Sequence, residues 1–156
     1  MIIRKIEKSD YTPIISVVDE WWGGRHMADM LPKLFFRHFK DTSFIAEVDG
    51  DLGAFLIGFI SQSHSNEAYI HFIGVNPEYR TMGLGRKLYL TFFEKVVTKG
   101  CNIVQCVTSP VNTGSIGFHT RMGFNIEKGD CQINGVSVHS NYDGPGEDRV
   151  LFFRQL

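Results

Sequence analysis

The sequence predicts an α/β protein, in which strands and helices alternate along one chain. Residues 69–75 are rich in aromatic and β-branched side chains, which favours a buried strand. Asn76-Pro77-Glu78 ends it, because proline has no N–H group for a sheet ladder. From Leu84 to Val96 an apolar residue recurs at every fourth position, as in a helix packed on a sheet. Strand, turn and helix therefore follow one another across residues 69–98.

Similar patterns predict the other elements. Ser9-Asp10 can cap a helix with Pro13 in its first turn, and Gly23-Gly24 ends it. Asn112 can cap a later helix that runs to Met122. We expect strands at residues 2–7, 43–48, 54–62, 69–75, 102–107, 124–131 and 150–153, helices beginning near residues 9, 29, 84 and 112, and a long polar loop at 134–149.

Length and composition predict one domain spanning residues 1–156, large enough for a real core. A net charge of −1 gives no general attraction to nucleic acid or to an anionic membrane. The chain shows no signal peptide, and no apolar run approaches the roughly 20 residues that span a bilayer. Three cysteines without C-x-x-C spacing argue against a disulfide framework or a zinc site. We therefore expect reduced thiols, a cytoplasmic location and no metal.

The turn before the third expected helix has the chemistry of an anion site. Gly83 and Gly85 lack a Cβ, so the backbone can expose its N–H groups to a ligand. These groups lie at a helix start, where the helix dipole adds positive potential. Arg80, Arg86 and Lys87 add side-chain charge, and a diphosphate would fit. On the glycines alone, a tight turn with solvated basic residues explains the pattern as well.

The flanking residues carry a resemblance to a known family. Val75 to Gly85 reads V-x-P-E-x-R-x-x-G-x-G, and Asn112 to Phe124 reads N-T-G-S-I-G-F-H-T-R-M-G-F. Both resemble motifs of the GNAT superfamily of N-acetyltransferases, in the same order, and the resemblance extends over residues 2–153. It implies a mixed, mostly antiparallel sheet of about seven strands with helices on both faces. It also implies acetyl transfer from acetyl-CoA to a primary amine of a small molecule or peptide.

The resemblance further implies where the cofactor lies. Strands 69–75 and 102–107 would run parallel and splay apart, with the pantetheine arm of acetyl-CoA between them. A backbone N–H of the first strand could stabilise the oxyanion. Family members often dimerise through their last strands, so residues 150–153 allow a homodimer, although they also suit a core strand. The expected cofactor contacts are Ile73, Gly74, Val75, Arg80, Thr81, Met82, Gly83, Leu84, Gly85, Arg86, Asn112, Ser115 and His119.

The proton donor to the leaving thiolate is a tyrosine in many family members, and His119 occupies that position here. An imidazolium with a pKa near ~6.5 can protonate a thiolate with a pKa near ~8.5. His119 is therefore the candidate acid. The alternative is a histidine on the helix surface that only packs on the cofactor.

A base is also expected, because an amine with a pKa of ~10.4 is almost fully protonated near neutral pH. Some family members place a glutamate where this chain has Tyr69. Glu67 lies two residues earlier and can share that strand face, so we take it as the candidate base. His71, Glu147, Asp148 and an ordered water are the alternatives.

The acceptor is expected near the first helices. Trp21 and Trp22 cannot share one helix face, so one of them, Trp22 in our prediction, can line the acceptor cleft. Arg25 could hold a carboxylate or phosphate of the acceptor, or could simply be solvated. A non-catalytic protein that binds or senses acyl-CoA is the alternative function, and a longer acyl donor also remains open. A nucleotide-phosphate site is disfavoured, because the chain has no G-x-x-x-x-G-K-S/T loop.

Overall fold

The computed structural model describes all residues, Met1 to Leu156, and builds them around a sheet of seven strands. The strand order is β1-β2-β3-β4-β5-β9-β6. All neighbouring strands run antiparallel except β4 and β5, which confirms the predicted mixed sheet. The strands are β1 (Ile2–Lys5), β2 (Phe44–Val48), β3 (Asp51–Ile60), β4 (Glu67–Val75), β5 (Ile103–Thr108), β6 (Asn125–Ile126) and β9 (Val150–Gln155).

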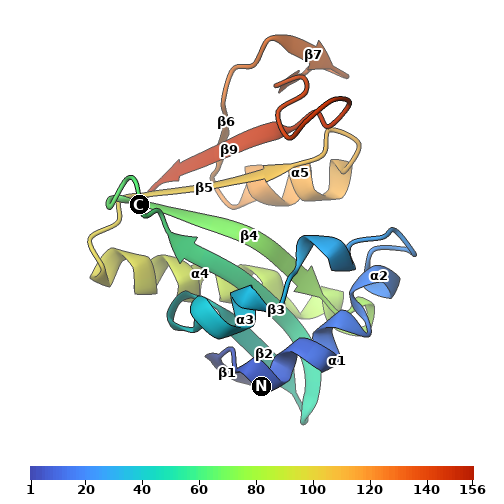
Figure 1. The fold of residues 1–156 in the computed structure, drawn as a ribbon, viewed down its shortest axis with the longest axis vertical. Helices are drawn as coiled ribbons and strands as arrows, with labels where there is room; N and C mark the ends of the chain where they lie inside the picture. The colour runs from blue at the N-terminus through green and yellow to red at the C-terminus, as the bar shows by residue number, and fades with distance from the viewer.

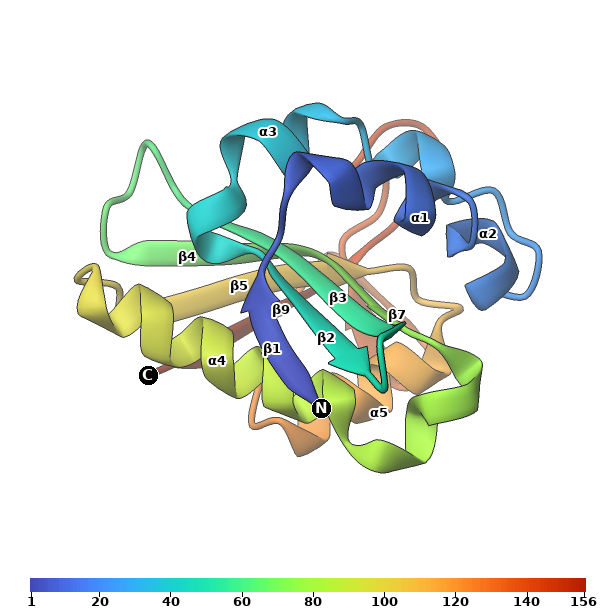
Figure 2. The ribbon, with the colours of Figure 1, turned by 90° about the horizontal axis from the view of Figure 1, so that it is seen from below.

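Helices cover both faces of this sheet (Figures 1 and 2). One face carries α4 (Leu84–Thr98) and α5 (Thr113–Arg121), over a core cluster that includes Leu88 and Phe92. The other carries the N-terminal helices, over a cluster that includes Phe36 and Phe55. The N-terminal helices are α1 (Tyr11–Ile15), α2 (Val18–Trp21) and α3 (Leu34–His38), and the short 3-10 helices are η1 (Lys8–Asp10), η2 (Ala28–Met30), η3 (Lys40–Thr42) and η4 (Pro77–Met82). None of the helices combines the length and the apolar character that crossing a membrane requires.

Strands β4 and β5 are parallel but stay together only at one end. Their pairing runs from Glu67 to Tyr69, and beyond it they diverge (Figure 1). A β-bulge accompanies the divergence: Phe72 pairs with Ile57 and Ile70 pairs with Gly58, so His71 is one extra residue in β4. A bulge bends its strand and increases the local twist. The far half of β4 therefore has an edge without a strand partner toward β5, as the resemblance implied.

The first two helices are more broken than we predicted. The helix expected from Ser9 to Gly23 divides into η1, α1 and α2, and Ser16 at the break donates to the Pro13 carbonyl at 2.8 Å. The helix expected from Asp29 to His38 divides at Pro32 into η2 and α3. Proline disfavours helical geometry in the residue before it and removes one N–H donor.

The C-terminal third also differs from the prediction. The strand expected at residues 124–131 is only Asn125–Ile126. A separate hairpin of β7 (Cys131–Ile133) and β8 (Val136–Val138) follows, within the region where we expected a loop. Asn134 and Gly135 turn it with φ of 51° and 79°, the conformation that Asn-Gly favours in two-residue hairpins. Strand β9 lies inside the sheet between β5 and β6, so the homodimer stays a prediction.

Candidate functional site

The turn between β4 and α4 exposes backbone amides. Asn76 begins it by accepting the Glu78 N–H at 3.0 Å. Gly83 ends it with φ of +70°, a left-handed conformation, and a Cβ there would meet nothing within 4 Å. Within α4, the first backbone amide that bonds to a carbonyl of the chain is that of Lys87, which donates to the Gly83 carbonyl at 3.1 Å. The preceding amides of α4 have no carbonyl one turn earlier in the helix, and the helix dipole points at them. This cradle fits a diphosphate.

The second glycine of the turn is buried, unlike Gly83. Gly85 is buried, and a Cβ there would lie 3.4 Å from the Phe118 ring and 3.6 Å from Val75. A Cβ at Gly85 would therefore make ordinary van der Waals contacts with α5 and β4, whereas a Cβ at Gly83 would point into open space.

The basic side chains of the turn lie in two places. Arg80 donates to the Trp21 carbonyl at 2.7 Å and so ties η4 to the end of α2. Arg86, Thr81 and Met82 are exposed around the start of α4. The structure thus brings the predicted cofactor residues of the turn together, with Arg80 engaged by the N-terminal helices.

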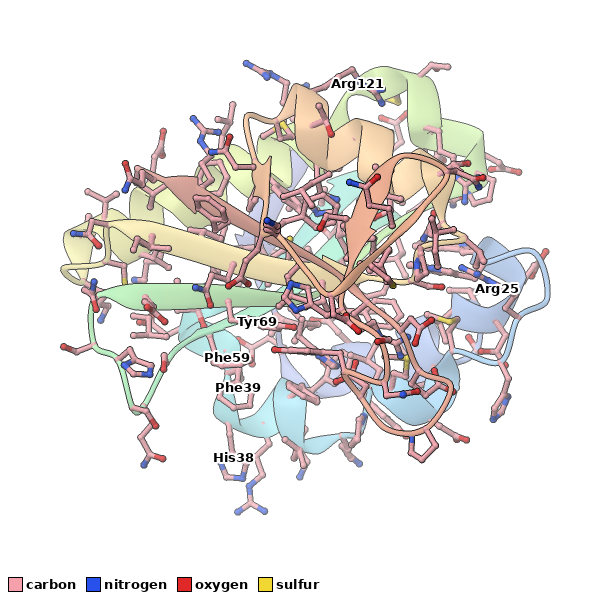
Figure 3. The ribbon with its side chains drawn as sticks, turned by 90° about the horizontal axis from the view of Figure 1, so that it is seen from above. Arg25, His38, Phe39, Phe59, Tyr69 and Arg121 are labelled. Atoms are coloured by element: carbon pink, nitrogen blue, oxygen red, sulfur yellow. The ribbon has the colours of Figure 1, made fainter.

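Residues Ile73, Gly74 and Val75 lie on the open half of β4, beside this turn. Trp22 covers that half from the side of the N-terminal helices, with its ring 4.8 Å from Phe72. Arg25 follows on the loop after α2, is exposed and makes no ion pair. Figure 3 places it at the edge of the molecule.

Helix α5 begins as predicted. The Asn112 side chain accepts the Ser115 N–H at 3.1 Å and caps the helix. The Ser115 hydroxyl lies 3.2 Å from Nδ1 of His119, one turn later.

His119 is a core residue with only 3% of its surface exposed. Its Nδ1 donates to the Ser115 carbonyl at 2.8 Å, so its Nε2 accepts from the Tyr89 hydroxyl at 2.7 Å. Its ring stacks on Phe152 at 4.8 Å. Burial lowers the pKa of His119, and the hydrogen bond to Ser115 opposes that shift in part. Because the ring is buried, the alternative of a histidine on the helix surface is wrong. Because both ring nitrogens are engaged, the acid role of His119 stays a prediction that this geometry does not favour.

Tyr89, the hydrogen-bond partner of His119, was not identified from the sequence. It is fully buried between α4 and α5, and burial raises its pKa. Its ring meets Phe118 and Phe124 edge to face. No motif marks it, because Tyr89 reads as one more apolar position of α4.

Glu67 lies apart from the other predicted site residues. It is the first residue of β4 and pairs with Ile103 at the closed end of the strand pair. Ile73 is six positions further along the strand, a distance of roughly 20 Å. The base role of Glu67 therefore stays a prediction that its position does not favour.

Tyr69 and His71 lie closer to where the strands part. Tyr69 stacks on Phe59, and Phe59 packs on Phe39, both with ring centroids 5.3 Å apart (Figure 3). Burial raises the pKa of Tyr69. His71 is the bulge residue itself.

The carboxylates of the loop after β8 are engaged within that loop. Asp148 accepts the Asn141 N–H at 2.8 Å, and Glu147 pairs with Arg149 at 3.2 Å. Arg149 also pairs with Asp143 at 2.8 Å. Of the two alternatives for the base in this loop, Glu147 is thus engaged by a guanidinium and Asp148 by a backbone amide.

Together, an amide cradle at a helix start and an open strand edge beside it define a protein that binds a phosphate-bearing cofactor with an extended arm. Comparison with known proteins gives the family. A sequence model described as the acetyltransferase (GNAT) family matches residues 3–124, so the chain belongs to this family. Its members are acetyltransferases that use acetyl-CoA, which confirms the predicted enzyme class and cofactor.

Individual relatives are distant. The chain is 30% identical over 83 residues to the L-2,4-diaminobutyric acid acetyltransferase of Nocardia farcinica, a match that covers 53% of this chain and 43% of that one. It is 26% identical over 137 residues to an acetyltransferase of Pectobacterium atrosepticum, covering 84% and 91%. The structure of diaminobutyrate acetyltransferase from Paenibacillus lautus, in complex with L-2,4-diaminobutyric acid and coenzyme A, superposes with a TM-score of 0.74 at 19% identity, covering 97% and 92%. The chain spans less than half the length of the first of these relatives.

Proposed function

We propose that this protein transfers the acetyl group of acetyl-CoA to a primary amine, as a single domain in the cytoplasm. The observation that carries the proposal is the amide cradle at the start of α4, placed at the end of the open edge of β4. The three free cysteines fit a reducing compartment. When bound, acetyl-CoA supplies the activated acetyl group.

Each part of the cradle has a task in this proposal. The amides from Thr81 to Arg86 bind the diphosphate, with charge from the Arg86 side chain. The open backbone groups of Ile73–Val75 pair with the amides of the pantetheine arm, in the manner of an added strand. A backbone N–H on β4 that points into the gap stabilises the carbonyl oxygen as negative charge develops on it. Asn112 and Ser115 flank the arm from α5.

The acceptor in this proposal approaches from the side of the N-terminal helices. Trp22 lines that side, and Arg25 is an unpaired guanidinium that can bind a carboxylate in bidentate fashion. Relatives of this chain act on 2,4-diaminobutyrate, an amino acid with a second primary amine. We therefore place amino acids and peptide N-termini first among acceptor candidates.

The test is acetyl transfer itself. Purified protein is mixed with acetyl-CoA and, in turn, with 2,4-diaminobutyrate, alanine-initiated peptides, polyamines and aminoglycosides, and released thiol is measured. We expect release with one class of amine only. Tight acetyl-CoA binding without release for every amine would favour the non-catalytic binding protein instead.

A further inference from the structure

The bulge in β4 brings a histidine to the point where the two parallel strands separate. His71 is the extra residue, two positions beyond the last β4–β5 pair at Tyr69. In the proposed function, the pantetheine arm of acetyl-CoA is anchored at the start of α4 and runs along β4. It would end near His71, where the gap between β4 and β5 closes. His71 and Phe72 both pack toward the N-terminal helices, because the bulge interrupts the alternation of the strand. The side chain is thus on the side from which an acceptor enters.

The hydrogen bonds of His71 define which nitrogen carries the proton. Its Nε2 lies 2.6 Å from the Met30 carbonyl oxygen. A carbonyl can only accept, so Nε2 donates and the neutral ring keeps its lone pair on Nδ1. The ring stacks on Phe35 at 4.4 Å with an interplanar angle of 9°, which fixes its orientation.

The Nδ1 atom of His71 has no partner within the protein. It is not fully enclosed, since the only fully enclosed side-chain nitrogen or oxygen without a partner is Nε2 of His139. A fixed ring with one accessible lone pair is the arrangement that a general base needs.

The surroundings keep the ring neutral. Burial lowers the pKa of His71, and the Met30 carbonyl opposes that shift in part. No charged side chain contributes to it. Asp29 pairs with His26, and Arg149 pairs with Asp143. The remaining titratable side chains on β4, η2 and α3, the elements that carry His71 or contact its ring, are Glu67, Tyr69, Arg37 and His38.

We infer that His71 is the general base of the reaction and accepts the acceptor's proton at Nδ1. This inference rests on the proposed acetyl transfer. The ammonium form of the acceptor first loses one proton to solvent. The neutral amine nitrogen then forms a bond to the acetyl carbon, and the second proton it loses passes to Nδ1. The carbon–sulfur bond breaks, its electron pair leaves with the sulfur of CoA, and the resulting thiolate takes up a proton from solvent. His71 then returns its proton to solvent.

Two other groups fit this role less well. Glu67 lies at the closed end of the strand pair, and both nitrogens of His119 are engaged by Ser115 and Tyr89. Among these three residues, only His71 combines a place at the divergence with a free lone pair.

The first test needs no acceptor. Two-bond ¹H–¹⁵N spectra of the full chain, with His71 assigned by comparison with His71→Gln, report the tautomer and its titration. We expect the Nε2–H tautomer near neutral pH and a midpoint below the ordinary ~6.5. An Nδ1–H tautomer, or an imidazolium at neutral pH, would overturn the inference even if the protein acetylates amines.

The second test is kinetic and uses the amine that the wild-type protein acetylates best. Glutamine can still donate to the Met30 carbonyl, so His71→Gln should keep the fold and the acetyl-CoA affinity. We expect kcat/KM to fall by ~10²–10⁴-fold, and the acidic limb of its pH profile to disappear. His38→Gln, an exposed histidine on α3 (Figure 3), is the matched control and should change neither.

A His71→Gln protein that keeps wild-type kcat/KM and the same acidic limb would refute the base role. If it does not fold, the spectra of the wild-type protein still decide. If the wild-type protein acetylates no amine at all, the proposed function fails, and the tautomer result shows separately whether His71 could have served.

Discussion

At the scale of single residues, His119 shows how a motif position can be filled by a group with different surroundings. The sequence correctly places His119 on the helix that carries the second family motif. Its burial and its bond to Tyr89 could not be read from the motif, because they depend on how α4 packs against α5. The Asn112 cap, in contrast, is a local interaction and was predicted correctly.

The buried histidine should make stability depend on pH. The folded state holds the pKa of His119 below the unfolded value of ~6.5, so at lower pH the unfolded chain takes up a proton that the folded chain does not. The unfolding free energy should therefore fall as the pH drops from about 7 to about 5, with a slope of up to about 1.4 kcal/mol per pH unit from this group.

Urea denaturation of the wild-type protein and of His119→Gln at both pH values measures the effect. His71 titrates in the same direction and remains in both proteins, so the difference between them isolates His119. Equal losses of stability on acidification would show that His119 does not titrate as described.

The hydroxyl of Tyr89 gives a second prediction. Tyr89→Phe leaves Nε2 of His119 buried without a donor, so we expect a loss of ~1–3 kcal/mol in unfolding free energy. Tyr142→Phe is the matched control, because Tyr142 is 51% exposed, and its cost should stay within about 0.5 kcal/mol. Similar costs for the two variants, measured by chemical denaturation, would argue against the buried hydrogen bond.

At the scale of elements, the turn from β4 to α4 was predictable because its glycines, proline and apolar periodicity are all local signals. The breaks at Ser16 and Pro32 and the Asn134-Gly135 hairpin have local signals too, although our prediction did not use them. The bulge at His71 has none. It depends on the register of β3 against β4, which a one-strand pattern does not specify.

Gly83 allows the role of this turn to be tested. Its φ of +70° is unfavourable for other residues by roughly 1–2 kcal/mol, and a bulkier side chain would project into the open cradle. Gly83→Val should therefore abolish acetyl-CoA binding as measured by calorimetry.

Gly100 supplies the control for that variant. It follows α4, has φ of +91° and likewise has nothing near its Cβ position. Gly100→Val should lose comparable stability but bind acetyl-CoA normally. A Gly83→Val protein with wild-type affinity would show that the cradle does not hold the diphosphate.

At the scale of the whole molecule, the sheet separates two apolar clusters and the cofactor gap opens between strands that belong to the same sheet. The mixed sheet of about seven strands and the helices on both of its faces followed from the family resemblance, whereas the strand order comes from the structure alone. Where the acceptor binds did not follow from the resemblance, because it depends on N-terminal helices whose lengths were wrongly predicted and on the ordered loop after β8.

Binding of acetyl-CoA should stabilise the folded protein by about 2.7 kcal/mol at a hundredfold excess over Kd, seen as a raised Tm.

The most direct test of the account is calorimetric titration with acetyl-CoA, followed in the same samples by thiol release with the panel of amines. We expect saturable binding with one site per chain and release with a single class of primary amine. Binding without release would contradict the transferase and leave a protein that only binds acyl-CoA. No binding of acetyl-CoA or CoA would contradict the assignment of the cradle at the start of α4, and the proposed function would fall with it.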